Sequence, residues 1–287
     1  MQVVKTVAEV RRLRQSGSGT WGLVPTMGFL HRGHLSLVEA ATRENDHVGA
    51  SIFVNPTQFG PQEDLAAYPR DLDRDLDLLE QAGVDLVWAP PVEEVYPAGY
   101  QTYVTVEEVT QPLEGASRPG HFRGVATVVA KLFNVFQPDR AYFGQKDAQQ
   151  VVVIKQMVRD LNFPLELVVC PIVRESDGLA LSSRNVYLNA EQRAAAPVLR
   201  RAICAAREAW LAGEHDGERL RGIMREILAA EPLATFGPGE YVSAADPTTL
   251  RELGNAERGV LLSLAVRVGR ARLIDNELLT AAAAGTA

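Results

Sequence analysis

The stretch Trp21–Asn45, WGLVPTMGFLHRGHLSLVEAATREN, decides the fold because a strand, a turn and a helix follow one another in it. The apolar run WGLVPTMG predicts a buried strand. In HLSLVEAATREN, Leu37, Val38 and Ala41 fall on one face at helical spacing while polar side chains fall on another, which predicts a helix. A strand that leads directly into a helix is the first half of a βα unit.

The same alternation continues through the first half of the chain. Short runs rich in β-branched residues predict further strands at residues 47–55, 84–91, 139–144 and 165–173. Helical periodicity predicts helices at residues 64–83, 124–138 and 147–162. Alternating strands and helices are typical of an α/β fold, here a doubly wound parallel sheet of about five strands.

After Val173 the composition and the hydrophobic pattern of the sequence change. Residues 174–189 are polar and turn-rich, and two Ala/Arg/Glu-rich helices are predicted at 190–213 and 216–230. Strands within 239–250 and 259–276 complete a small α+β unit, and the Ala-rich tail from Ala281 is expected to fray. Because 287 residues exceed the usual single-domain length of roughly 100 to 200, the sequence predicts two domains, residues 1–173 and 174–287.

Composition limits the partners and the compartment. Hydrophobic residues make up 46% and charged residues 23%, which is typical of a soluble globular chain. A net charge of −7 and the lack of a Lys/Arg block disfavour nucleic acid as a partner but allow a small anionic ligand. The two cysteines lack metal-ligand spacing, and neither a signal sequence nor a run of about 18 apolar residues occurs, so we expect a cytoplasmic protein without a membrane span.

His31 and His34 stand three residues apart where the first strand gives way to its helix, with Gly33 between them. In a doubly wound sheet, ligands bind beyond the carboxyl ends of the strands. A helix start offers free N–H groups and a partial positive charge, and Gly33 lets a ligand approach the backbone. The pair therefore favours a phosphate site. The alternatives are a zinc pair, for which no third ligand lies nearby in the sequence, and a purely structural pair.

Two further polar clusters follow predicted strands. Gly144, Lys146 and Asp147 in FGQKD come after the strand at 139–144, where an ammonium group can reach an anion at the sheet edge. The cluster Ser182 to Arg184 in LSSRN lies in a loop after the last strand of the first domain. Such a loop either closes over a nucleotide or serves as a polar linker.

Four motifs together carry a resemblance to a known family. PTMGFLHRGH resembles the HxGH signature of the nucleotidylyl-transferase superfamily, and the ordered set PTMGFLHRGH, FVNPTQF, FGQKD and LSSRN is similar to that of the pantothenate synthetase family. The resemblance implies a Rossmann-like ATP domain with a smaller C-terminal lid domain. It also implies ATP-dependent ligation of (R)-pantoate to β-alanine through a pantoyl-adenylate, with AMP and pyrophosphate released, and it implies Mg²⁺ and a homodimer.

The resemblance also assigns roles to single residues. His34 matches the family's proton donor, and Gln58 and Gln150 match the two glutamines that hold pantoate, with Gln58 also next to where β-alanine enters. Leu181 stands where the family usually has methionine, which is a volume-conserving replacement. The positions that match ATP contacts are Met27, Gly28, His31, Gly33, His34, Gly144, Gln145, Lys146, Asp147, Val173, Leu181, Ser182, Ser183 and Arg184.

The chemistry of adenylation fits these residue types. Attack of a carboxylate on the α-phosphorus of ATP needs positioning and charge stabilisation rather than a side-chain nucleophile. The predicted catalytic set, which supplies donors to the phosphate oxygens, is His31, His34, Lys146, Ser182, Ser183 and Arg184.

For several charged side chains the sequence allows both a ligand-binding and a structural interpretation. Asp75 in the acidic run YPRDLDRDL is the predicted Mg²⁺ ligand, with a solvated helix face as the alternative. His121, Arg123 and Lys131 lie in or beside one predicted helix, where they either reach ligand phosphate or have structural roles.

Two other functions are weighed against the ligase. An adenylyltransferase with a phosphate acceptor would require Arg or Lys where Gln58 and Gln150 stand. A nucleotide-binding regulatory module or a tRNA-binding module is disfavoured by the acidic balance and by the lack of a basic extension.

Overall fold

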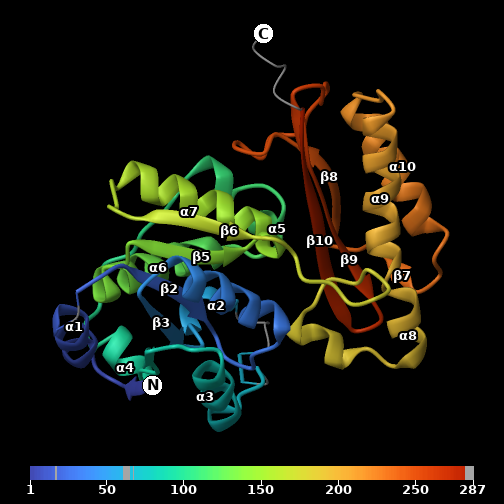
Figure 1. Ribbon diagram of the computed structural model, residues 1–287. Coiled ribbons are helices and arrows are strands. Elements are labelled where there is room, and N and C mark those ends of the chain that lie inside the picture. Colours follow the sequence, from blue (N-terminus) through green and yellow to red (C-terminus); the bar gives the residue numbers. More distant parts are fainter. Residues whose placement is uncertain (17, 61–64, 67, 282–287) are drawn as a thin grey trace. The chain divides into compact units, whose positions relative to one another are not determined.

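The computed structural model describes residues 1–16, 18–60, 65–66 and 68–281, and the chain divides into two compact units (Figure 1). The first unit contains Met1–Glu107, Arg118–Gln145 and Val153–Val173. The second contains Glu108–Ser117, Lys146–Val152 and the chain from Arg174 onward. Two short segments from the middle of the sequence therefore belong to the C-terminal unit. Of the tail expected to fray, residues 282–287 lie outside the described residues.

A parallel six-stranded sheet forms the centre of the first unit, in the order β1-β4-β3-β2-β5-β6. This confirms the predicted parallel α/β sheet. Its five predicted strands are β2 (Trp21–Thr26), β3 (His47–Ile52), β4 (Leu86–Trp88), β5 (Arg140–Gly144) and β6 (Glu166–Cys170). The sixth, β1 (Gln2–Val4), escapes prediction because three residues are too few to show a period.

The order of the strands reverses between β2 and β5, which are neighbours in this sheet. From β2 the sheet extends through β3 and β4 on one side, and β5 and β6 lie on the other. In open α/β sheets, the crevice beyond the carboxyl ends of the strands at such a switch point is the usual ligand site. The turn that carries the two histidines follows β2, and Gly144 and Gln145 lie at the end of β5. These predicted site residues therefore lie at the switch point.

Helices cover both faces of the sheet (Figure 1). Val48 and Ala50 of β3 join Leu37 in a buried cluster on one face. Side chains alternate along a strand, so Gly49 faces the other side, where a Cβ would lie 2.7 Å from Cε1 of Phe136. Glycine at this position lets the second helical layer pack closely. The helices of this unit are α1 (Val7–Ser16), α2 (Arg32–Glu44), α3 (Leu72–Gln81), α4 (Val92–Val95), α6 (His121–Phe136) and the C-terminal part of α7 (Ala148–Asp160).

The predicted helix at 64–83 is α3, which begins only at Leu72 because Asp71 caps it, its side chain accepting the N–H of Arg74. Residues 64 and 67 of that prediction lie outside the described residues. Within the described residues, every helix falls short of the length and apolarity that a bilayer span requires.

The second unit packs helices on one face of a small antiparallel sheet. β9 pairs along its whole length with β10, and β7 and β8 pair with its other edge. The α+β prediction is confirmed, but the helix predicted over 190–213 is two helices, because Pro197 lacks the N–H that would continue the first of them. The helices and strands are α5 (Glu114–Ser117), the N-terminal part of α7, α8 (Ala190–Ala195), α9 (Val198–Leu211), α10 (Gly217–Ala229), β7 (Ala234–Thr235), β8 (Tyr241–Ala245), β9 (Gly259–Val268) and β10 (Ala271–Thr280).

Candidate active site

The turn between β2 and α2 is closed by two histidine side chains. His31 is the N-cap of α2, and its Nδ1 accepts the N–H of Gly33 at 3.1 Å. Nδ1 of His34 accepts the N–H of His31 at 3.3 Å, and the two ring centroids lie 4.0 Å apart. This is a capping box in which imidazoles replace the usual hydroxyl and carboxyl side chains. Because both Nδ1 atoms accept, a neutral ring at either position carries its proton on Nε2, an atom that can donate to phosphate.

Asp75 contacts the same turn. Its side chain is 1% exposed, Oδ2 accepts the N–H of Phe29 at 2.6 Å, and Oδ1 accepts the N–H of Leu30 at 2.7 Å. A carboxylate enclosed in this way is bound to the backbone, so the geometry gives Asp75 a structural contact in place of the predicted Mg²⁺ ligation. In the part of the chain that the structure describes, no group of three or more His, Cys, Asp or Glu is placed to hold a metal ion, which leaves the zinc alternative without a ligand set.

Gln58 ends the short 3-10 helix η1 (Pro56–Gln58), which follows β3. Its Nε2 donates to Sδ of Met27 at 3.0 Å, and its Oε1 accepts from Nδ2 of Asn55 at 3.1 Å. Asn55 is 1% exposed, and its Oδ1 also accepts the Tyr96 hydroxyl at 2.9 Å. The structure thus connects two predicted site residues, Met27 and Gln58. Sequence reasoning missed Asn55, although it begins the NPTQF motif and an Asn before Pro is a common turn signal.

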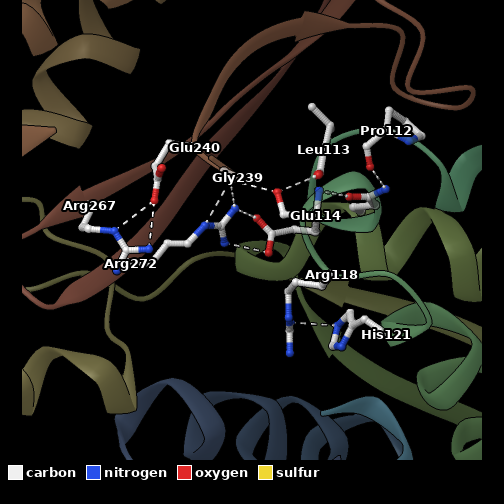
Figure 2. A network of polar contacts seen from close by, with 11 residues as sticks. Pro112, Leu113, Glu114, Arg118, His121, Gly239, Glu240, Arg267 and Arg272 are labelled. Carbon is white, nitrogen blue, oxygen red and sulfur yellow. Dashed lines mark hydrogen bonds and ion pairs between the residues drawn. The ribbon is translucent and has the colours of Figure 1, made fainter. Parts of the chain in front are cut away.

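His121 lies at the start of α6, and both ring nitrogens have partners. Nε2 lies 3.1 Å from a guanidinium nitrogen of Arg118 (Figure 2), and Nδ1 lies 2.9 Å from the carbonyl oxygen of Gln58. Because arginine only donates, the neutral ring accepts at Nε2 and donates from Nδ1. The imidazole of His121 is therefore bound to the backbone of a predicted substrate-binding residue.

The two other cations of this helix lie over tyrosine rings. Cζ of Arg123 is 3.8 Å from the ring centroid of Tyr103, and Nζ of Lys131 is 4.4 Å from that of Tyr100. Burial lowers the pKa of Lys131 below its usual value. These cation–π contacts supply the structural role that the sequence left open for both residues. A contact with ligand phosphate stays a prediction.

Lys146 belongs to the second unit, where the C-terminal sheet holds its backbone. Asn276 of β10 is 3% exposed and donates from Nδ2 to the carbonyl oxygen of Lys146 at 2.9 Å. Nζ of Lys146 lies 3.5 Å from Oδ1 of Asp147, and the lysine side chain is 20% exposed. The ammonium group of Lys146 is therefore mostly enclosed, while its neighbour Asp147 is exposed.

The neighbours Gln149 and Gln150 have different environments. Gln149 is 5% exposed, and its Oε1 accepts the N–H of Glu114 at 2.9 Å. Its Nε2 donates to the carbonyl oxygens of Val109 and Pro112 at 3.0 and 2.8 Å. The side chain of Gln149 is therefore fully engaged with main-chain groups. Gln150 is half-buried, and it is the glutamine that the motif matches to pantoate. Residue type alone does not separate two adjacent glutamines, and only the family motif assigns the pantoate role to Gln150.

The loop Ser182 to Arg184 is also fixed within the second unit. Oγ of Ser182 accepts the N–H of Arg184 at 3.2 Å and caps the 3-10 helix η4 (Ser183–Tyr187). Upstream, Arg174 donates to both carboxylate oxygens of Asp275 at 2.7 and 2.8 Å. Of the remaining predicted ATP contacts, Gly144, Gln145 and Val173 belong to the first unit and Leu181 to the second.

The fold and the histidine turn define a class of protein, namely a nucleotide-binding α/β enzyme with an HxGH motif at the start of a helix. Comparison with known proteins identifies the family. The family model described as Pantoate-beta-alanine ligase matches residues 2–278. A pantothenate synthetase from Herpetosiphon aurantiacus is 65% identical over 277 residues, which cover 96% of this chain and 99% of that protein.

Solved structures agree with this assignment. A pantothenate synthetase from Thermus thermophilus has a TM-score of 0.90 and 54% identity, covering 96% of this chain and 99% of its own. A pantoate-beta-alanine ligase from Francisella tularensis, in complex with beta-gamma ATP and beta-alanine, has a TM-score of 0.77 and 35% identity, and 97% of each chain is covered. The chain belongs to the pantoate–beta-alanine ligase family, and it is a ligase that forms an amide bond.

Proposed function

We propose that the protein joins (R)-pantoate to β-alanine in an ATP-dependent reaction that passes through a pantoyl-adenylate and releases AMP and pyrophosphate. The observation that carries the proposal is the histidine cap of α2 at the switch point of the sheet, in a chain of this family. The Francisella tularensis relative, solved with beta-gamma ATP and beta-alanine, supports the same two substrates here.

In the first step, a carboxylate oxygen of pantoate attacks the α-phosphorus of ATP, and the bond to the pyrophosphate oxygen breaks. His31 and His34 donate from Nε2 to phosphate oxygens, because their Nδ1 atoms are engaged in the helix cap. His34 supplies the proton or hydrogen bond to the leaving pyrophosphate. The further contacts to ATP are Met27, Gly28, Gly33, Gly144, Gln145, Lys146, Asp147, Val173, Leu181, Ser182, Ser183 and Arg184.

In the second step, the amine of β-alanine attacks the acyl carbon of pantoyl-adenylate, the amine loses a proton, and AMP leaves. Gln58 and Gln150 bind pantoate through its hydroxyl and carboxyl groups, since an amide side chain both donates and accepts without adding a competing charge. The hydrogen bonds of Gln58 to Met27 and Asn55 limit its rotamers before substrate arrives. The lid role of the C-terminal domain and a homodimer in the cytoplasm are further parts of this proposal.

Magnesium enters this proposal as the complex of ATP with Mg²⁺. Both oxygens of the predicted ligand Asp75 accept backbone N–H groups, so this residue does not fit a ligand role. Hard cations prefer oxygen donors, and the phosphate oxygens of ATP supply them together with water. Bound Mg²⁺ would neutralise charge on the leaving pyrophosphate.

The test is an assay of the purified protein with ATP, Mg²⁺ and pantoate, in which pyrophosphate release is followed before and after β-alanine is added. We expect pantoate-dependent pyrophosphate release and then AMP release on addition of β-alanine. A protein without pantoate-dependent turnover contradicts the proposal.

His34→Asn and His34→Gln form a matched pair for the role of His34. Asparagine places an acceptor near the position of Nδ1 and keeps the cap, but it removes Nε2, so the rate should fall about 10²- to 10³-fold with little loss of stability. Glutamine is a standard third-position residue of a capping box, so it keeps an acceptor for the N–H of His31, and its amide NH₂ lies near the position of Nε2. It should therefore keep more activity than His34→Asn, also with little loss of stability. Full activity in His34→Asn would exclude this role for Nε2.

A further inference from the structure

Asp75 is a buried carboxylate whose partners lie on another element of the first unit. It sits in the first turn of α3, yet its two oxygens accept the consecutive amides of Phe29 and Leu30 in the β2–α2 turn at 2.6 and 2.7 Å. Hydrogen bonds of this length to an ionised acceptor are among the stronger ones in proteins. The carboxylate thereby fixes two successive peptide groups just before His31.

The turn that Asp75 holds has an unusual backbone. Gly28 has φ of 83°, and Phe29, a residue with a Cβ, has φ of 52°. A Cβ at position 28 would lie 2.9 Å from Oδ2 of Asp75, so glycine is needed for the carboxylate to reach the amides. Left-handed φ at a bulky residue persists where surrounding contacts hold it. Asp75 supplies those contacts.

Arg74 holds the same turn through different atoms. One guanidinium nitrogen donates to the carbonyl oxygen of Leu30 at 3.0 Å, and Cζ lies 5.7 Å from the ring centroid of Phe29. Both backbone polar groups of Leu30 are therefore bound by neighbouring residues of α3. The next residue is His31, whose N–H is bound by His34. The contacts run without a break from α3 to the two imidazoles.

We propose that Asp75 and Arg74 are positioning residues for adenylation: they hold the β2–α2 turn in the conformation that aims His31 and His34 at the phosphates of ATP. This inference rests on the proposed function. It replaces the magnesium-ligand role of Asp75 with a role exerted through the backbone. Asp75 then influences the step in which pyrophosphate leaves and has no direct contact with the reacting atoms.

The test compares Asp75→Asn and Arg74→Gln with Asp77→Asn, an exposed position of the same helix. Asparagine has the shape of aspartate, but its NH₂ group faces one of the two N–H donors. We expect Asp75→Asn to lower pantoate-dependent ATP–pyrophosphate exchange by roughly 10- to 100-fold, because small misplacement of positioned groups has large effects on rate. Transfer of the acyl group from added pantoyl-adenylate to β-alanine should stay within about twofold of the unsubstituted protein. Arg74→Gln should show the same split with a smaller loss.

The dependence of exchange on Mg²⁺ concentration separates positioning from ligation. Positioning predicts an unchanged half-saturating Mg²⁺ concentration in Asp75→Asn, whereas a ligand role predicts an increase and recovery of rate at high Mg²⁺. Recovery of this kind overturns the inference. So does an exchange rate equal to that of Asp77→Asn, or a loss of equal size in both half-reactions, which would indicate a lower folded fraction.

Two further measurements, on Arg74→Gln and on ATP binding, test the inference where Asp75→Asn does not fold or where the exchange activity is absent. Should Asp75→Asn fail to fold, Arg74→Gln decides the question, since its side chain is 48% exposed and its loss is tolerated more easily. Absence of pantoate-dependent exchange in the unsubstituted protein contradicts the proposed function. The inference is then still tested by calorimetry of ATP binding, which must be weaker in Asp75→Asn than in Asp77→Asn.

Discussion

At the scale of single residues, His31 and His34 combine an observed structural role with a proposed chemical one. Nδ1 of each ring accepts a backbone N–H at the start of α2, and in the proposed function Nε2 donates to phosphate. Protonation of Nδ1 would remove the acceptor that the cap requires, so the cap and the tautomer depend on each other. The two rings are tilted with centroids 4.0 Å apart, so positive charges on both would repel each other unless an anion were bound between them. The structural and the functional interpretation of the pair are therefore compatible.

Tyr142 gives a prediction at this scale that concerns stability. Its hydroxyl, on β5, donates to Oε2 of Glu44 at 2.9 Å and accepts from Nδ2 of Asn45 at 2.7 Å. Burial raises the pKa of Tyr142 to about 12, and the hydrogen bond to Glu44 acts in the same direction. In the unfolded chain a tyrosine ionises near pH 10. Between pH 10 and 12 the unfolded state therefore binds fewer protons, and the free energy of unfolding should fall as pH rises.

Urea denaturation at pH 9, 10 and 11 measures this effect. The fall due to one such group is at most about 1.4 kcal/mol per pH unit. Tyr142→Phe should be less stable than the unsubstituted protein at pH 9 but should lose less stability between pH 10 and 11. If the free energy of unfolding fell equally with pH in the two proteins, Tyr142 would not be the cause of the fall.

At the scale of elements, α6 and η1 approach each other through a glycine. A Cβ on Gly124 of α6 would lie 2.4 Å from the carbonyl oxygen of Thr57, and Nδ2 of Asn55 donates to the carbonyl oxygen of Gly124 at 3.2 Å. Close packing of these two elements sets the position of Gln58, the last residue of η1. Gly124 therefore has a specific effect on the predicted pantoate site.

Gly124→Ala tests this packing, and Gly222→Ala in α10 is its matched control. A Cβ at position 222 would meet no atom within 4 Å, so alanine there should stabilise the protein by about 0.5–1 kcal/mol. At position 124 the backbone of η1 must move, and a loss of about 1–3 kcal/mol is expected. The KM for pantoate should rise in Gly124→Ala and stay unchanged in Gly222→Ala. Thermal unfolding measures the change in stability, and rates at varied pantoate concentration measure KM. An unchanged KM in Gly124→Ala would show that the packing of α6 on η1 does not affect pantoate binding through Gln58.

Elements with a clear period were predictable, and contacts distant in sequence were not. The strand and helix around the histidines follow from local patterns within Trp21–Asn45, so the βα unit and the turn between its two elements could be predicted, and phosphate binding by this turn stays a prediction. The contact of Asp75 with Phe29 joins residues 46 positions apart, and that of Gln149 with Glu114 joins residues 35 apart. Hydrophobic periodicity reports on neighbouring residues and carries no information about contacts between residues so far apart in the sequence. From the sequence, Asp75 is therefore interpreted as a metal ligand or a solvated side chain, whereas in the structure it accepts backbone N–H groups.

At the scale of the whole molecule, the second unit is assembled from three separate pieces of chain. Arg272 of β10 donates to both carboxylate oxygens of Glu114 at 2.8 and 2.7 Å, as Figure 2 shows, and to the carbonyl oxygen of Gly239. Ser117 donates to the same carbonyl oxygen at 2.8 Å. These bonds, together with those of Gln149, attach the segment Glu108–Ser117 to the C-terminal sheet. The unit that carries Lys146 and Ser182 is thus more than the C-terminal stretch of sequence.

A fragment of residues 174–287 should therefore be less stable than the same region in the full chain. It keeps α8, α9, α10 and all four strands of its sheet, but it lacks α5. Arg272 loses its ion pair with Glu114, and Asn276 loses its hydrogen bond to the carbonyl oxygen of Lys146. Hydrogen exchange of the β9 amides, which lie at the centre of this sheet, measures the difference. We expect protection factors lower by at least about tenfold in the fragment, which corresponds to about 1.4 kcal/mol. Equal protection in fragment and full chain would show that the C-terminal sheet is stable without the two internal segments.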